Sequence, residues 1–324
     1  MDYFRVYDNF NITPLIQKHQ GKTIEELFPN HQTIANKMGE FLKISHKPIN
    51  IPVNLDLNIS KKGLVNNLKV VPYIGEEIEA LLKKRGISNL YDLRHVFKYG
   101  KYAKQIIDLI KQHDFKSLSN NQYVYDIDIS FCFNLNELLF LDIETLDIYD
   151  SPIIIFGYGF FKNSSFHIKI LFAREISEEI AICEHLKNKI LPRFKCFITY
   201  NGKSFDIPYL ANRFMYYFDS NPMISENDTP YESLNTLYHH IDLYHNCRRK
   251  FKGLFYNYTL TDMEKLILNF YRENDVPGNL IGFCYRKYLK DPYRYIGPIK
   301  ECIEHNYYDV YSMPLILDKL LNYQ

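Results

Sequence analysis

Two carboxylates, Asp142 and Glu144, lie two residues apart directly after the apolar run 138–141. The apolar run predicts a short buried strand, and residues two apart on a strand project from the same face of its sheet. Both carboxylates can therefore point into one site, as oxygen ligands for a hard cation such as Mg²⁺ or Mn²⁺. Such a site could hydrolyse phosphodiesters by a two-metal mechanism, although an acidic pair with this spacing also occurs by chance.

A third acidic residue, Asp206, follows the apolar run 196–200 after an Asn201-Gly202 break. The break predicts that a strand ends there, and Ser204 is a candidate cap for the helix that follows. Asp206 then lies in the first helical turn, where the helix dipole stabilises a carboxylate. It is either a further metal ligand or a residue that only stabilises the helix end.

His305 and Asp309 lie four residues apart in a predicted helix over roughly 299–322. This spacing places both side chains on one helix face, one turn apart. Asp309 is then a candidate metal ligand, and His305 is the candidate base or orienting group for the attacking water. The alternative is an ordinary surface ion pair. Pro314 predicts a kink or a break in this helix.

The elements that must position these groups follow an α/β pattern. The segments 138–141, 152–159 and 166–172 predict three successive strands, which fit an antiparallel meander. The segment 196–200 predicts a fourth strand, followed by a helix. The acidic residues thus lie where strands end and helices begin.

The order, spacing and local sequence of these motifs resemble the DEDD 3′–5′ exonuclease superfamily, and within it the YprB-like ribonuclease-H-like branch. The resemblance covers roughly residues 136–324, and it includes the segment 241–245, the Arg248-Arg249 pair and the stretch 275–278. It implies an α/β, RNase H-like fold with a mixed sheet flanked by helices. It also implies 3′–5′ exonuclease activity on single-stranded DNA or single-stranded ends.

The resemblance also implies a set of metal ligands, and the sequence departs from the superfamily at one position. The implied ligands of two Mg²⁺ or Mn²⁺ ions are Asp142, Glu144, Asp206 and Asp309. In the superfamily a tyrosine lies four residues, or a histidine five residues, before the last aspartate. Here His305 lies four residues before Asp309 and takes the place of the tyrosine. A histidine can orient or deprotonate water, so activity is still expected.

Basic residues are concentrated in one part of a chain whose formal net charge is only +1. Residues 244–300 contain eleven lysines and arginines against five acidic residues. The densest cluster, interleaved with aromatic residues, is Arg248, Arg249, Lys250 and Lys252. Since cations hold phosphates and aromatic rings stack on bases, we predict that this cluster and Asn201 contact single-stranded nucleic acid. The alternative is a solvated basic face over core aromatic residues.

Residues 66–125 are predicted to form a smaller, mostly helical module, and residues 1–65 are a further region whose fold the sequence leaves open. The segment 71–93 resembles a helix-hairpin-helix motif. Gly86 is predicted to end one of its helices and Ser88 to cap the next.

Helix-hairpin-helix motifs bind a DNA phosphate through backbone N–H groups at a helix N-terminus. Here Tyr73 replaces the usual first glycine of the hairpin. Glu76, Glu77 and Glu79 lie where a phosphate would approach, and their charge repels an anion. A structural or protein-contact role is therefore favoured over DNA binding.

Composition excludes several other classes of protein. The six cysteines are scattered and never in C-x-x-C spacing, which argues against a zinc site and a disulfide framework. We find no signal peptide and no apolar run near the length of a membrane span, so a cytoplasmic location is expected. Two functional alternatives stay open: an RNA-trimming exoribonuclease, since no pattern identifies a reader of the 2′-hydroxyl, and an inactive nucleic-acid-binding or scaffold protein.

Overall fold

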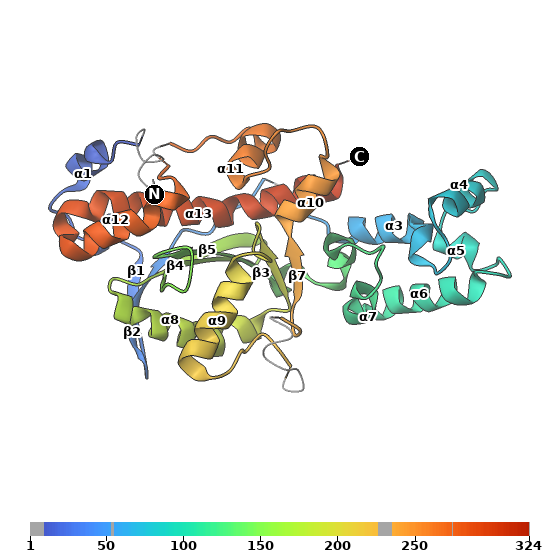
Figure 1. Ribbon diagram of the computed structural model, residues 1–324, viewed down its shortest axis with the longest axis horizontal. Coiled ribbons are helices and arrows are strands. Elements are labelled where there is room, and N and C mark those ends of the chain that lie inside the picture. The colour runs from blue at the N-terminus through green and yellow to red at the C-terminus, as the bar shows by residue number, and fades with distance from the viewer. Residues whose placement is uncertain (1–9, 53–54, 226–234, 274, 324) are drawn as a thin grey trace.

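A seven-stranded mixed sheet forms the centre of the protein (Figure 1). The computed structural model describes residues 10–52, 55–225, 235–273 and 275–323. In sheet order, the strands are β1 (His31–Asn36), β2 (Gly39–Ser45), β5 (Ser165–Phe172), β4 (Ile153–Lys162), β3 (Leu138–Thr145), β6 (Cys196–Thr199) and β7 (His239–Asp242). Neighbours from β1 to β3 are antiparallel, whereas β6 and β7 run parallel to β3. The predicted α/β mixed sheet and its antiparallel meander are confirmed.

Helices cover both faces of this sheet (Figure 1). One face carries α12 (Gly278–Lys290) and α13 (Pro292–Asn322), and the other carries α8 (Glu179–His185) and α9 (Asp206–Phe218). Shorter helices are α1 (Thr13–His19), α2 (Ile24–Leu27), α10 (Leu243–Lys250) and α11 (Leu260–Met263). Short 3₁₀ or π segments are Leu68–Val70, Asp126–Cys132, Leu135–Glu137, Ile176–Glu178, Leu186–Ile190, Leu191–Arg193 and Glu264–Leu268. Each sheet face therefore packs against its own apolar helix layer.

The helix α13 crosses the sheet without a break, although it contains Pro298 and Pro314. The predicted break at Pro314 is therefore wrong. Both prolines are buried, and packing of a buried helix face supplies most of a helix's stability in a protein. It outweighs the one hydrogen bond that each proline removes. Across the described part of the chain, no helix is both long and apolar enough to cross a membrane.

The sheet takes in residues from the N-terminal region 1–65. The hairpin β1–β2 adds two strands, because β2 pairs with β5 from Leu42 opposite Phe172 onward. Residues 31–45, which lie outside the unit predicted over 136–324, therefore form two further strands of that unit's sheet. Residues 1–9 and 53–54 of the N-terminal region lie outside the described residues.

The helical module projects from one end of the sheet (Figure 1). Its helices are α3 (Asn58–Asn66), α4 (Glu76–Lys84), α5 (Leu90–Leu93), α6 (Gly100–Gln112) and α7 (Phe115–Ser119), which enclose an apolar core of their own. Gly86 follows α4 with a φ of +83°, as the predicted helix end requires. The predicted cap Ser88 is wrong, since Asn89 caps α5 by accepting the N–H groups of Tyr91 and Asp92 (2.9 and 3.1 Å). The shorter Ser88 side chain instead donates to the Asp92 carboxylate.

Asp126 joins the helical module to the sheet edge at β7. The Asp126 carboxylate accepts hydrogen bonds from Lys203 Nζ (2.5 Å), from Asn246 Nδ2 (2.7 Å) and from the backbone N–H of Asp242 (3.2 Å). Because three separate segments donate to one carboxylate, this junction holds the module against β7 and α10.

Candidate active site

Asp142 and Glu144 project from β3 toward α13. Leu138 and Phe140, which share their side of the strand, pack in the α13 layer, whereas Leu139 and Leu141 pack in the α8–α9 layer. The predicted common face of the two carboxylates follows directly from this alternation. The strand extends to Thr145, four residues beyond the predicted apolar run, so both carboxylates lie within β3.

Asp206 is the first residue of α9 and is tied to the same strand. Its Oδ1 accepts the backbone N–H of Ile143, which lies between Asp142 and Glu144, at 3.0 Å. The predicted place of Asp206 in the first helical turn is confirmed. The predicted cap Ser204 is wrong, because Phe205 occupies the N-cap position without a side-chain hydrogen bond. One hydrogen bond thus brings the second motif to the first.

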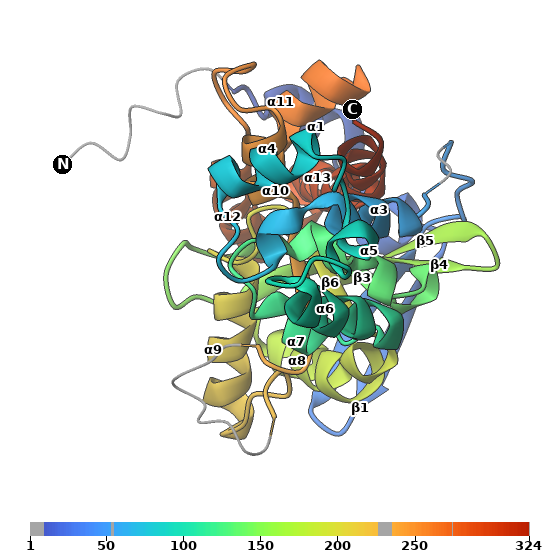
Figure 2. The ribbon, with the colours of Figure 1, turned by 90° about the vertical axis from the view of Figure 1, so that its right-hand side faces the viewer.

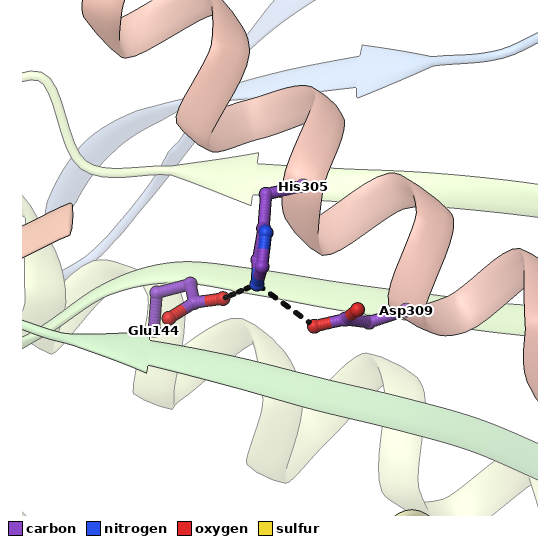
Figure 3. Close-up of side chains that lie close together, drawn as sticks. All are labelled: Glu144, His305 and Asp309. Atoms are coloured by element: carbon purple, nitrogen blue, oxygen red, sulfur yellow. Dashed lines mark ion pairs between the residues drawn. The ribbon is translucent and has the colours of Figure 1, made fainter. Parts of the chain in front are cut away.

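Figure 3 shows Glu144 from β3 and His305 and Asp309 from α13 pointing toward one another. His305 Nε2 lies 3.8 Å from Glu144 Oε1 and 3.4 Å from Asp309 Oδ2. One ligand atom from each of these three residues lies within 4.8 Å of the others, which is close enough for them to hold one metal ion. The predicted i, i+4 face of α13 therefore does meet the first motif.

A segment without regular structure holds both residues of the third motif in place. Arg272 Nη2 lies 2.5 Å from Asp309 Oδ1, and Asp275 Oδ1 lies 2.6 Å from His305 Nδ1. The same guanidinium forms a two-bond ion pair with Glu264 (2.6 and 2.8 Å), and its side chain is only 3 % exposed. The sequence analysis missed Arg272 and Glu264, which carry no local signal, and it noted Asp275 only as part of the resemblance.

Asn306 is a further residue of the site that sequence spacing did not single out. Its Nδ2 donates to Asp142 Oδ2 at 2.7 Å and to the Asp142 carbonyl at 3.2 Å. Opposite Asp142 on β4 is Gly157, where a Cβ atom would overlap Asn306 Oδ1. A glycine at this position therefore lets α13 approach the sheet closely enough for Asn306 to reach Asp142.

Replacing Gly157 by alanine should push α13 away from β4 and break the Asn306–Asp142 hydrogen bond. Overpacking of this kind costs about 1–3 kcal/mol, which urea unfolding would measure. Gly63→Ala is the matched control, since no atom lies within 4 Å of its added Cβ. In the helix α3 that change should stabilise by roughly 0.5–1 kcal/mol. Equal effects of the two variants would mean that the contact does not limit helix approach.

The clustered carboxylates would carry a strong excess of negative charge if all of them were ionised. Loss of water and the neighbouring Asp309, Asp206 and Glu144 raise the pKa of Asp142 well above its usual range. Burial raises the pKa of Glu144 to about 8 and that of Asp206 to about 7. Burial alone would lower the pKa of His305, but Asp309, Asp275 and Glu144 raise it to about 9. Without bound cations, the cluster therefore holds protons at neutral pH.

These pKa values predict how the stability of the metal-free protein depends on pH. Each raised pKa means that the folded state binds more protons than the unfolded state, so stability falls as pH rises through that window. In EDTA, the melting temperature should decrease from about pH 5 to about pH 9. With Mg²⁺ the fall should be smaller or reversed, because metal binding displaces protons and strengthens as pH rises. Thermal unfolding across this range, with and without Mg²⁺, checks both signs.

The residues predicted to contact nucleic acid form no hydrogen bond or ion pair with the carboxylate cluster among the described residues. Arg248, Arg249 and Lys250 are exposed at the C-terminal end of α10, and Lys252 follows on an exposed turn. Arg249 is engaged with Asp126 (3.4 Å) and lies over the Tyr125 ring. Asn201 is exposed, with a φ of +66° in the turn before Asp206. Their role as substrate contacts stays a prediction.

Comparisons with known proteins cover the same part of the chain. A family model described as RNase H superfamily matches residues 139–321, which include all five clustered residues of the three motifs. A Bacillus subtilis (strain 168) protein named YprB, described as uncharacterized, is 26% identical over 186 residues. That alignment spans 56% of this chain and 41% of YprB. The predicted RNase H-like fold and the YprB-like resemblance are confirmed, whereas the helix-hairpin-helix motif, outside the family match, stays a prediction.

Proposed function

The chain belongs to the RNase H superfamily, and on that premise we propose that it is a metal-dependent hydrolase of phosphodiester bonds in nucleic acid. The observation that carries the proposal is the convergence of four carboxylates, from β3, α9 and α13, on one site. Their charge is opposed within the described contacts by Arg272 and by protonated His305. Such a site needs added positive charge to be fully ionised, and divalent cations would supply it.

The donor set fits hard divalent ions. Carboxylate oxygens are the preferred ligands of Mg²⁺ and Mn²⁺, and the residues that would hold two such ions are Asp142, Glu144, Asp206 and Asp309. When bound, the two ions supply an activated water and stabilise the leaving 3′ oxygen. Asn306 orients Asp142, the Ile143 N–H orients Asp206, and Arg272 orients Asp309.

His305 is proposed to orient or deprotonate the attacking water. With a pKa of about 9 in the metal-free protein, the ring is protonated at neutral pH and cannot accept a proton. A bound cation that compensated the charges of Glu144 and Asp309 would lower this pKa and leave Nε2 able to accept a proton. Asp275 holds the ring through Nδ1, so the position of Nε2 is set before the substrate binds.

We further propose a 3′–5′ exonuclease that acts on single-stranded DNA or single-stranded ends, with RNA as the alternative substrate. The direction and the exonuclease mode come from the resemblance to the DEDD superfamily. The exposed cations Arg248, Lys250 and Lys252 on and after α10 support contact with a phosphate backbone.

The proposal is tested by digesting oligonucleotides labelled at the 5′ end, as both DNA and RNA, with Mg²⁺ or Mn²⁺. A ladder that shortens from the 3′ end, depends on metal and is absent in Asp142→Asn is the expected result. Internal cuts would retain the metal site but contradict the exonuclease mode. Folded protein that cleaves neither polymer with either metal would overturn the proposal in favour of a binding or scaffold protein.

A further inference from the structure

A basic groove lies on the helical module, apart from the carboxylate cluster. Arg94, Lys101 and Lys104 line a hollow of about 520 Å³ between α6 and the segment before it. A second hollow of about 330 Å³ shares Arg94 and Lys104 and adds Lys111. Phe97 also lines the first hollow, and it is 105% exposed, so that none of its ring is used in the core. We call this surface the α6 groove.

The cations of the α6 groove are available to an external anion. Its acidic lining residue, Asp108, pairs with Lys111 at 3.7 Å. Among the described residues, no carboxylate lies within ion-pair distance of Arg94, Lys101 or Lys104. Arg94 Nε instead donates to the neighbouring imidazole of His95 at 2.9 Å, which holds the guanidinium at the surface.

The fold brings these cations together through a glycine contact. A Cβ atom at Gly100 would overlap the carbonyl oxygen of Arg94, so only glycine lets α6 begin this close to the preceding segment. The Gly100 N–H is bonded to the Val96 carbonyl at 2.7 Å, which closes the turn. Arg94 is thereby placed beside Lys101 and Lys104, although they lie on different elements.

The first turns of α4 and α6 differ in charge. The first turn of α4 carries Glu76, Glu77 and Glu79, whereas the first turn of α6 carries no acidic residue and includes Lys101. Figure 2 looks onto the module and shows these two helices at opposite ends of it. The first turn of α4 therefore repels a polyanion, whereas the first turn of α6 does not.

We propose that the α6 groove binds a single-stranded stretch of the nucleic-acid substrate outside the catalytic site. Arg94, Lys101 and Lys104 would hold successive phosphates, and Phe97 would stack on a base. An exposed ring among unpaired cations suits a single strand better than an acidic protein, because every base offers a face for stacking. The identity of the ligand rests on the proposed function, but binding at the groove can be measured without catalysis.

The test measures binding of the full chain to labelled single-stranded DNA and RNA in EDTA, by fluorescence anisotropy over a range of salt concentrations. Lys101→Glu/Lys104→Glu should weaken binding about tenfold or more and reduce the salt slope by about 1.4, at about 0.7 for each lost phosphate contact. Phe97→Ala should weaken binding about fivefold or more through lost stacking, at no folding cost. The control Lys37→Glu/Lys162→Glu changes the net charge equally at exposed positions far along the sheet.

Unchanged affinity in Lys101→Glu/Lys104→Glu, or an equal loss of affinity in the control, would overturn the proposal that the α6 groove binds nucleic acid. Equally tight binding of poly-glutamate would also overturn it, in favour of an acidic protein partner. Metal-dependent cleavage is scored separately on the unmodified chain. Binding that depends on the α6 groove, without cleavage, would contradict only the proposed nuclease function. Cleavage together with binding that the groove variants leave unchanged would contradict only the proposed role of the groove.

Discussion

Asp142→Asn should abolish hydrolysis and, at the same time, raise the thermal stability of the metal-free protein. If Asp142 ligates a metal ion as proposed, its loss should slow cleavage by about 10³-fold or more, since a bound ion contributes several kcal/mol to the transition state. Stability should rise because burial among Asp206, Glu144 and Asp309 forces the Asp142 carboxyl either to take up a proton or to stay charged beside them, and both cost free energy on folding. The amide keeps an oxygen that can accept the Asn306 hydrogen bond, so packing is preserved.

The measurement is a pair of melting curves, in EDTA and in saturating Mg²⁺, beside a cleavage assay. Each kcal/mol of relieved repulsion should raise the melting temperature by roughly 2–4 °C. Added Mg²⁺ should stabilise the unmodified protein, by about 2.7 kcal/mol at a hundredfold excess over Kd, and Asp142→Asn much less. Asp219→Asn, at an exposed left-handed helix end, is the control and should change neither curve. Retained cleavage in Asp142→Asn would place the metal site elsewhere.

Arg272→Gln should be the most destabilising single change near the site. The guanidinium bridges Glu264 and Asp309 with its side chain 3 % exposed, so its loss leaves two enclosed carboxylates without a cation. Removal of one partner from a buried ion pair costs about 3–5 kcal/mol. Arg272→Lys should recover only part of this loss, because one ammonium group cannot reproduce the planar fork toward Glu264.

Urea unfolding in EDTA measures this loss, and Arg286→Gln provides the matched control. Arg286 also pairs with an aspartate, Asp147, but both side chains are about half exposed (45% and 61%). Exposed pairs contribute about 0–1 kcal/mol, so the control should unfold almost as the unmodified protein does. Mg²⁺ should restore part of the stability of Arg272→Gln, since a bound cation would compensate Asp309. A loss below about 1 kcal/mol would show that the cluster needs no fixed cation.

The two variants together test whether electrostatic repulsion or packing dominates the stability of the site. Asp142→Asn removes a carboxyl that folding forces to take up a proton or to stay charged among other carboxylates, and it should stabilise the metal-free fold, whereas Arg272→Gln removes the fixed positive charge and should destabilise it. Opposite signs at the same site are expected only if electrostatic repulsion dominates, because loss of packing would destabilise both variants. The double variant should therefore recover part of the stability lost in Arg272→Gln.

Local sequence was sufficient to predict which acidic residues share a face and which elements carry them. The two-residue spacing of Asp142 and Glu144 on β3 places both on one face of the strand, and the four-residue spacing of His305 and Asp309 places both on one face of α13.

Strand and helix types followed from apolar runs, whereas the caps predicted at Ser88 and Ser204 and the break predicted at Pro314 were the local errors. Asn89 rather than Ser88 reaches the start of α5, α9 begins after Phe205 without a side-chain cap, and packing holds α13 together across Pro314.

Contacts between distant segments decided the rest of the site. Arg272 contacts Asp309, and Asp275 contacts His305, although α12 and the first part of α13 separate each pair along the chain. The segment that carries Arg272 and Asp275 has no periodic pattern of its own. The close approach of α13 depends on Gly157, whose missing side chain makes room for Asn306. Spacing along a chain reports only which residues share a face of one element. Which faces then meet, and which buried charges compensate one another, depends on packing among residues far apart in sequence, and so only the folded structure reveals them.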